Sequence, residues 1–351
     1  MKAVSGRGFA PMFLSYYESV TKLNERVSAA VGVEKRGRYT ASVPRSGAVL
    51  LNIFLTVVLP IFIVAGSGAV LQRVRPGSLG LLGPAALYIF GPALVLNGLL
   101  RTQLPLEVSL RIVAAAAITM FAMVAVSWVV SRLLRLDRTT ESGFMLAGAF
   151  GNSGNMGIPL SFLAFGDEGL SVAIIVFVAH TSINWPVGIY IAARGHVRGW
   201  APLLQALRAP TLYAVPLALA IRGFDWTLPT TLERPISMLA DAAIPAMLLV
   251  LGYQLAQGIE LRQPGSMTTV LATRLIAGAV VGAGVTMLMG LEGVVRNTVV
   301  LIAAMPAAVF VSILATEYRT VPRFVASSVI IGTFASLVTL TVVINLLQRW
   351  D

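Results

Sequence analysis

Residues 148–159 of the 351-residue chain concentrate groups that could bind a small molecule. The stretch GAFGNSGNMGIP holds two asparagines and a serine among four glycines. An asparagine amide can donate hydrogen bonds to a carboxylate, and glycines let the backbone approach a ligand closely. The same polar groups could instead cap the ends of interrupted helices. We predict contact with a small anionic substrate by Asn152, Ser153, Gly154, Asn155 and Gly157.

A second unusual stretch lies at Ala303–Ala308, around Pro306. Proline removes a backbone N–H and glycine weakens neighbouring helical turns, so helices should break both here and near Pro159. A helix broken inside a bilayer needs protein or a water-filled cavity to satisfy its freed backbone groups. We therefore predict that Pro159 and Pro306 mark a crossover of two broken helices. Met305 and Ala307 would line this crossover from the second break.

Three further polar residues lie in or near apolar stretches. Asp241 could carry a proton, pair with an arginine such as Arg274, or lie at the level of the lipid headgroups. His180 could couple a proton to transport, because imidazole titrates near neutral pH. Alternatively, it is a hydrogen-bonded structural residue with Asn184 one turn on. Asn97 is a further candidate for lining a cavity.

The composition excludes an ordinary soluble protein. Hydrophobic residues make up 57% and charged residues 12% of the chain, whereas soluble domains carry about 25% charged residues. The net charge of +11 is distributed between apolar runs, which favours contact with lipid headgroups over binding to nucleic acid. The chain has no cysteine and two histidines, so we expect no metal, no cofactor and no soluble catalytic domain.

Ten apolar runs are long enough to cross a bilayer as helices, since a spanning helix needs roughly 20 mostly apolar residues. The linkers between the runs are short. We therefore expect an all-α, multi-pass membrane protein embedded in the lipid bilayer. The predicted spans are residues 49–71, 79–100, 107–134, 142–166, 168–193, 202–222, 236–256, 267–290, 295–316 and 323–347.

The two halves of the chain repeat one pattern. Residues 89–96 in the second span resemble 243–250 in the seventh, and 111–114 in the third resemble 274–277 in the eighth. The fourth and ninth spans, which carry the two breaks, also match. Because each half has an odd number of spans, the halves insert in opposite senses, which is the inverted-repeat arrangement of secondary transporters. The predicted repeats are residues 49–200 and 201–351.

Residues 1–48 differ from the rest, with eight Lys and Arg residues and no apolar run long enough to span. Apolar residues recur there every three or four positions, which predicts a basic amphipathic segment at the membrane surface and not a signal peptide. Alternatively, the native start lies downstream and the segment is dispensable. After residue 48, twelve arginines fall on one side and six on the other, which places both termini outside. The N-terminal segment argues for the opposite orientation. Its eight basic residues would lie on the side that holds six arginines, which gives fourteen against twelve.

The two interrupted spans also carry a family resemblance. Residues 151–160 (GNSGNMGIPL), 303–306 (AAMP) and 316–318 (TEY), with Pro322 shortly after, resemble the auxin efflux carrier family and its bacterial members. That family is related to other inverted-repeat transporters such as the bile-acid/sodium symporters. The resemblance covers nearly all of the chain after residue 48. The chain departs from many plant members by lacking a large hydrophilic loop between spans five and six, and its N-terminal segment is not part of the family pattern.

The resemblance implies ten spans in two inverted five-helix repeats with broken, crossing helices 4 and 9. Spans 1, 2, 6 and 7 would form a scaffold, and spans 3–5 and 8–10 a moving transport domain. The resemblance further implies a homodimer formed through the scaffold helices and termini outside the plasma (inner) membrane. The substrates would be small organic anions such as auxin or a dicarboxylate.

The leading hypothesis is therefore a secondary transporter, not an enzyme, that moves a small organic anion by an elevator or rocking motion around the crossover. We expect half-helix N-termini and amides to bind the anion without a full positive charge. A sodium-coupled organic-anion symporter is an alternative, weakened by the lack of a cluster of intramembrane carboxylates. An intramembrane serine protease is a remote alternative, because Gly151–Gly154 fits a Gly-x-Ser-Gly pattern and His180 could act as the base. Two matching breaks have no purpose in a protease.

Overall fold

The computed structural model describes residues 46–193, 210–256, 258 and 264–350. Their regular structure is helical, and the one extended pairing among them is an isolated bridge between Gly151 and Ala307. The expectation of an all-α protein is therefore confirmed for the described residues. The predicted amphipathic segment at residues 1–48 lies outside them, apart from its last three positions, which begin the first helix.

The helices of the first half follow the apolar runs of the sequence. Local signals fix several of their ends: at the start of α7, the Asp137 carboxylate accepts hydrogen bonds from the backbone N–H groups of Thr139 and Thr140, which would otherwise lack partners. The elements are α2 (Ser46–Ile53), η1 (Phe54–Val58), α3 (Leu59–Val74), α4 (Leu82–Ala85), η2 (Ala86–Phe90), α5 (Gly91–Arg101), α6 (Leu106–Leu133), α7 (Arg138–Ala149), η3 (Ser153–Gly157) and α8 (Ile158–Ala193), where η denotes a π-helical turn.

The second half is built in the same way. Pro322 is the first residue of the last helix, where the missing N–H of proline costs no helical hydrogen bond. The elements are α10 (Thr211–Gly223), α11 (Thr230–Leu255), α12 (Pro264–Ala272), η4 (Thr273–Ala277), α13 (Gly278–Leu288), α14 (Gly293–Ala303), α15 (Phe310–Glu317) and α16 (Pro322–Leu347).

Seven helices among the described residues are long and apolar enough to cross a bilayer. This number is lower than the ten predicted spans, because a span that is interrupted does not form one long helix and is not counted by helix length. Residues Ser153–Ala193 count once, although Gly166 (φ 66°, ψ −153°) leaves the helical region at the boundary predicted between the fourth and fifth spans. The predicted ninth span is split between α14 and α15, and α10 is short. The chain is thus an integral multi-pass membrane protein, and the count of ten stays a prediction.

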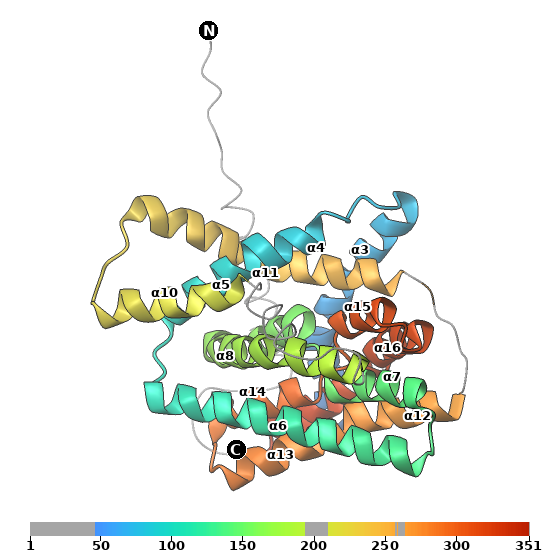
Figure 1. The fold of residues 1–351 in the computed structure, drawn as a ribbon. Helices are drawn as coiled ribbons and strands as arrows, with labels where there is room; N and C mark the ends of the chain where they lie inside the picture. The colour runs from blue at the N-terminus through green and yellow to red at the C-terminus, as the bar shows by residue number, and fades with distance from the viewer. Residues whose placement is uncertain (1–45, 194–209, 257, 259–263, 351) are drawn as a thin grey trace. The chain divides into compact units, whose positions relative to one another are not determined.

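The helices gather in two groups, which Figure 1 shows. Helix α11 packs along α3 and α5, and α10 packs along α5. In the other group, α6 packs against α7, α8 and α13, and α14 packs against α8 and α13. The turn η3 contacts α11, so the glycine-rich motif lies where the groups meet.

The contact between α3 and α11 depends on a glycine. A Cβ added at Gly252 would lie only 1.7 Å from the carbonyl oxygen of Ala65. No other residue fits at this position unless the helices move apart. Small residues are the usual means of close helix approach in a bilayer, where packing replaces the hydrophobic effect between helices.

Candidate functional site

The first break separates α7 from η3 and α8. Helix α7 ends at Ala149, and Phe150 is extended (φ −100°, ψ 114°). Asn152 is also outside the helical region, with φ −79° and ψ 70°. Pro159 lies past the break, as the second residue of α8 directly after the π-helical turn η3. A π-helical turn is one of the adjustments by which a membrane helix accommodates the hydrogen bond that a proline removes.

The second break separates α14, which ends at Ala303, from α15, which begins at Phe310. The two breaks lie directly against each other, and Met305 and Ala307 are buried there. Each break satisfies backbone groups that the other has freed, as a membrane interior requires. The contacts are an antiparallel bridge between Gly151 and Ala307, a 2.8 Å hydrogen bond from the Asn152 N–H to the Pro306 carbonyl, and a 2.9 Å hydrogen bond from the Ala308 N–H to the Phe150 carbonyl.

The polar side chains of the first break lie at this junction. Asn152 and Ser153 are buried, while Gly154 and Asn155 are half-buried. The N–H of Gly157 donates to the Asn152 carbonyl at 2.9 Å and so helps to fix the backbone of Asn152. Among the described residues, the amide nitrogen of the Asn152 side chain has no hydrogen-bond partner. An unpartnered buried donor is costly, so this amide is a candidate donor to a bound ligand.

A buried arginine also reaches the junction. Arg274, in η4, is 4% exposed. Its Nη1 donates to the carbonyl of Ala149 at 2.7 Å and to that of Gly148 at 3.4 Å, and its Nη2 donates to the carbonyl of Ala303. Ala149 and Ala303 are the last residues of α7 and α14. The guanidinium therefore caps two helix C-terminal ends, where the helix dipoles are negative.

Arg274 bears on two expectations from the sequence. A full positive charge lies beside the two breaks, in addition to the helix N-termini and amides expected there. Asp241, considered as a partner of Arg274, is exposed on α11, and the guanidinium of Arg274 contacts backbone carbonyls instead. In the sequence, Arg274 counts only as one of the twelve arginines on one side of the membrane, and this count does not reveal its role at the breaks. A usable signal was Gly278 one turn on, where an added Cβ would lie 2.6 Å from the Nη2 of Arg274.

A small cavity adjoins the guanidinium between α6 and α8. Its volume is about 10 Å³, which is room for roughly one water molecule and too little for an organic acid. The structure thus brings His180 and Asn184 together beside Arg274. The polar atoms that line the cavity and lack a partner in the described part of the chain are Thr119 Oγ1, His180 Nδ1, Asn184 Oδ1 and Arg274 Nε.

Two of the predicted residues lie elsewhere. Asn97 lines an open pocket of about 610 Å³ between α5, α10 and α11, together with Arg101, Arg222 and Trp226. Asp241 is exposed on α11. Neither residue lines the cavity beside Arg274, so the roles considered for them stay predictions.

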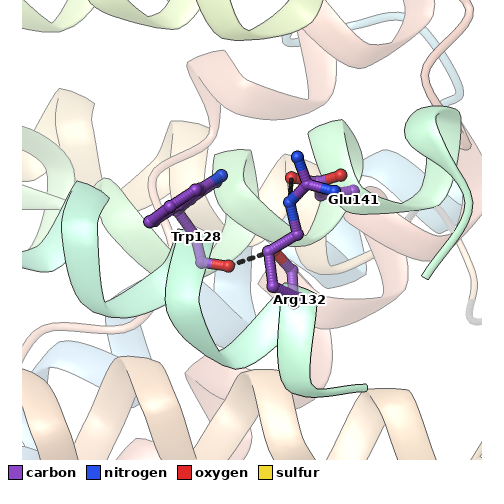
Figure 2. Close-up of polar contacts among 4 residues, drawn as sticks. Trp128, Arg132 and Glu141 are labelled. Atoms are coloured by element: carbon purple, nitrogen blue, oxygen red, sulfur yellow. Dashed lines mark hydrogen bonds and ion pairs between the residues drawn. The ribbon is translucent and has the colours of Figure 1, made fainter. Parts of the chain in front are cut away.

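A buried acidic residue that we did not predict lies at the start of α7. Glu141 is 1% exposed and pairs with the Nε of Arg132 on α6 at 3.5 Å. Figure 2 shows Arg132 beside both Glu141 and Trp128, and its guanidinium carbon lies 5.9 Å from the centre of the indole ring. Glu141 was overlooked because the predicted fourth span began one residue later, whereas α7 begins at Arg138.

Comparison with known proteins places the sequence of this chain in a family. A family model described as "Membrane transport protein" matches residues 53–198 and 200–344. A protein of Methanothermobacter thermautotrophicus named "Uncharacterized transporter" is 28% identical over 253 residues, which cover 71% of this chain and 82% of the relative. A protein of Rhizobium meliloti named "Putative malonate transporter" is 24% identical over 303 residues, which cover 83% of this chain and 95% of the relative.

The plant relatives match a shorter part of the chain. Auxin efflux carrier component 3a of Oryza sativa subsp. japonica is 30% identical over 139 residues, which cover 38% of this chain and 22% of the relative. The family consists of transporters rather than enzymes, which removes the protease alternative for Ser153 and His180. The chain belongs to the membrane transport protein family that includes the auxin efflux carriers.

Proposed function

We propose that the protein is a secondary transporter that carries a small organic anion across the membrane at the junction of the two breaks. The observation that carries the proposal is the unpartnered amide of Asn152 where the breaks pair. Family membership supports transport as the activity. The choice of an organic anion rests on the chemistry of the junction and on the Rhizobium relative, whose name refers to malonate.

The junction combines several sources of positive potential for a carboxylate. The N-terminal ends of η3 and α15 begin at the breaks, and helix N-termini carry partial positive charge. The guanidinium of Arg274 adds a full charge nearby. The amides of Asn152 and Asn155 add directional hydrogen-bond donors. An anion bound here would be held by dipoles and amides, with a buried cation behind them.

The proposed motion carries the breaks past the other helix group. Helices α6–α8 and α12–α16, which correspond to predicted spans 3–5 and 8–10, would form the transport domain. Helices α3, α5, α10 and α11 would belong to the scaffold of spans 1, 2, 6 and 7. The contact between η3 and α11 supports this division, because it puts the first break at the boundary that would slide. The same proposal includes ten spans in inverted repeats, crossing helices, a dimer formed through the scaffold, and termini outside the plasma membrane.

The test is transport current on proteoliposomes adsorbed to a solid-supported membrane, with monocarboxylates, dicarboxylates and indole-type acids in turn. We expect current for one class of acid, and we expect the Asn152→Ala variant to lose most of it. Electroneutral exchange gives no current, so it is measured by counterflow of a radiolabelled acid. If the wild-type protein shows neither current nor counterflow for any acid, the proposed function is wrong.

A further inference from the structure

A pocket of about 610 Å³ lies between α5, α10 and α11, and none of the residues of the two breaks lines it. Its volume falls within the range of about 300–1,000 Å³ that is typical of sites for small molecules. We propose that this pocket binds the phosphoethanolamine headgroup of a zwitterionic phospholipid. Such a site is independent of which substrate the protein carries.

The charged side chains that line the pocket balance one another. Two of them are arginines and two are carboxylates. A pocket with an excess of basic residues suits an anionic headgroup, but here an anion is attracted by one pair and repelled by the other. A zwitterion can place its phosphate near the arginines and its ammonium group near the carboxylates. The four residues are Arg101, Arg222, Asp225 and Glu233.

The four charged side chains do not neutralise one another by direct contact. In the described part of the chain, no ion pair joins either arginine of the pocket to Asp225 or Glu233. All four side chains are exposed. Opposite charges that line one pocket without touching leave room between them for a ligand that carries both charges.

The two arginines are held in place by neighbouring helices. Nη1 of Arg222, on α10, donates to the carbonyl of Leu99 on α5 at 3.1 Å. Nη2 of Arg101, the last residue of α5, donates to the Oγ of Ser237 on α11 at 3.4 Å. Each guanidinium keeps further N–H donors that have no partner among the described residues. Because a guanidinium binds phosphate through two such donors, both arginines can receive a phosphate group.

The pocket also lies at the level expected for lipid headgroups, since it adjoins the ends of the apolar helices α5 and α10. Just after α10, Phe224 and Trp226 are exposed and stack with their ring centroids 5.2 Å apart. Trp226 lines the pocket, and tryptophan is enriched at the boundary between membrane and water. Leu217, one turn before the pocket residue Ile221, is exposed on α10, which leaves a place for an acyl chain.

A headgroup in this pocket would join two helices at the point where they separate. Helices α10 and α11 each pack along α5, and Figure 1 shows them diverging toward the loop that connects them. Arg222 belongs to α10 and Glu233 to α11, so a zwitterion that pairs with both ties the two helices together. Bound lipid should therefore stabilise the folded protein.

The experiment adds lipid to the full-length protein after delipidation in detergent and measures thermal unfolding. Dioleoyl phosphatidylethanolamine, phosphatidylcholine and phosphatidylglycerol are compared at equal concentration. Phosphatidylethanolamine should raise the melting temperature by about 2–4 °C more than the other two lipids. The trimethylammonium group of phosphatidylcholine cannot donate hydrogen bonds to carboxylates, and phosphatidylglycerol has no cation. Equal stabilisation by all three lipids, or the largest effect from phosphatidylglycerol, would overturn the inference.

A soluble zwitterion is the other source of the same chemistry. Phosphoethanolamine at millimolar concentration has the headgroup without the acyl chains, and it should leave the melting temperature nearly unchanged. A rise equal to that produced by the lipid would show that the pocket takes a soluble compound, and the assignment to a phospholipid would be wrong.

Variants separate the two halves of the pocket. Arg222→Gln removes a positive charge and its paired donors, so it should lose most of the response to phosphatidylethanolamine. If this variant cannot be purified, Arg101→Gln takes its place. The double variant Asp225→Asn with Glu233→Gln removes both carboxylates. It should still respond to phospholipid but should no longer prefer phosphatidylethanolamine to phosphatidylglycerol, and a preference that survives would contradict the role of the carboxylates.

Arg234 provides the matched control. It follows Glu233 directly and is also exposed, but it does not line the pocket. Arg234→Gln should keep the full response to phosphatidylethanolamine. Equal losses in Arg222→Gln and Arg234→Gln would show a general effect of surface charge and would overturn the inference.

Discussion

The carbonyl of Ala149 accepts a 2.7 Å hydrogen bond from Arg274, so a side chain from the second half of the chain caps a helix of the first. A related contact runs the other way, because Arg111 on α6 donates to the carbonyls of Met289 and Gly290 at the end of α13. Arg111 and Arg274 begin the similar segments in the third and eighth predicted spans. Each half thus supplies an arginine that caps a helix end of the other half.

We predict that Asn152→Ala loses most of the acid-induced current. Removing a hydrogen bond to a charged ligand costs roughly 1.5–3 kcal/mol, which is about a tenfold to hundredfold loss of affinity. The measurement is an acid titration of current on the solid-supported membrane.

Asn345→Ala is the matched control for Asn152→Ala. Asn345 on α16 is also buried with an unpartnered amide nitrogen among the described residues. It lies thirteen residues after Gly332, where an added Cβ would contact Pro306 at 3.6 Å, and this is roughly 20 Å along a helix. Asn345→Ala should therefore keep its affinity. Equal losses in the two variants would count against a site at the junction.

The turn at Gly166 gives a second prediction. Its φ of 66° and ψ of −153° fall in a region that only glycine adopts readily, so Gly166→Ala should cost about 1–3 kcal/mol. An added Cβ there meets no atom within 4 Å, so the cost is conformational and not steric. Thermal unfolding in detergent measures it. Gly284→Ala in α13, also in open space, should not destabilise, and an unchanged melting temperature for Gly166→Ala would contradict the prediction.

The close contact of α3 and α11 gives a third prediction. Gly252→Ala places a methyl group 1.7 Å from the carbonyl oxygen of Ala65, so the helices must separate at a cost of about 1–3 kcal/mol or more. We expect a lower melting temperature and an unchanged apparent affinity for the acid, because the junction is not touched. Gly66→Ala, on α3 but in open space, should melt like the wild-type protein. Reduced affinity in folded Gly252→Ala protein would show that this contact reaches the site.

The N-cap of α7 gives a prediction for pH dependence. Hydrogen bonds from the side chain and backbone of Thr140 lower the pKa of the Asp137 carboxyl from its ordinary value of 3.8. Because the pKa is lower in the folded state, the stabilisation is present above about pH 4 and is lost as the pH falls further. Asp137→Ala should cost about 1 kcal/mol at neutral pH. Melting temperatures from neutral pH downward should show the difference from wild type shrinking below that pH.

The serine variant at the same position checks the mechanism. Serine is also a good N-cap residue, but its hydroxyl does not titrate in this range. Asp137→Ser should therefore melt close to wild type at neutral pH and should differ from Asp137→Ala by a constant amount as the pH falls. A pH-independent difference between the wild-type protein and Asp137→Ala would refute a role for the carboxylate.

Much of the fold was predictable because its signals are local. Glycine and proline act on their own helix, so the boundary near Gly166 and the interruption at residues 150–152 fell where the sequence indicated. Apolar runs identified the helices, since chain length and hydropathy are enough to predict a span. The number of spans was not reproduced by the length of the helices, because a broken span such as α14 with α15 has no single long helix.

The candidate site was predictable only in part. Asn152 and Ser153 were identified because they lie within the motif that breaks the helix. The role of Arg274 depends on Ala149 and Ala303, which are distant in sequence, and no local pattern reports such contacts. Glu141 was missed for a different reason: the predicted span began at residue 142, four residues after the true start of α7 at Arg138, and so excluded it.

The pairing of Gly151 with Ala307 also constrains how the protein is made. The partner of the first break, Ala307, lies 156 residues after Gly151, so it is synthesised only when most of the chain has already been made. Until then, the freed backbone groups at residues 150–152 lack their hydrogen-bond partners from the second break. Unpaired backbone groups are costly inside a bilayer. The first half cannot reach its final form before the second arrives, so the junction is among the last parts of the molecule to assemble, and a chain that stops short of it has no completed site.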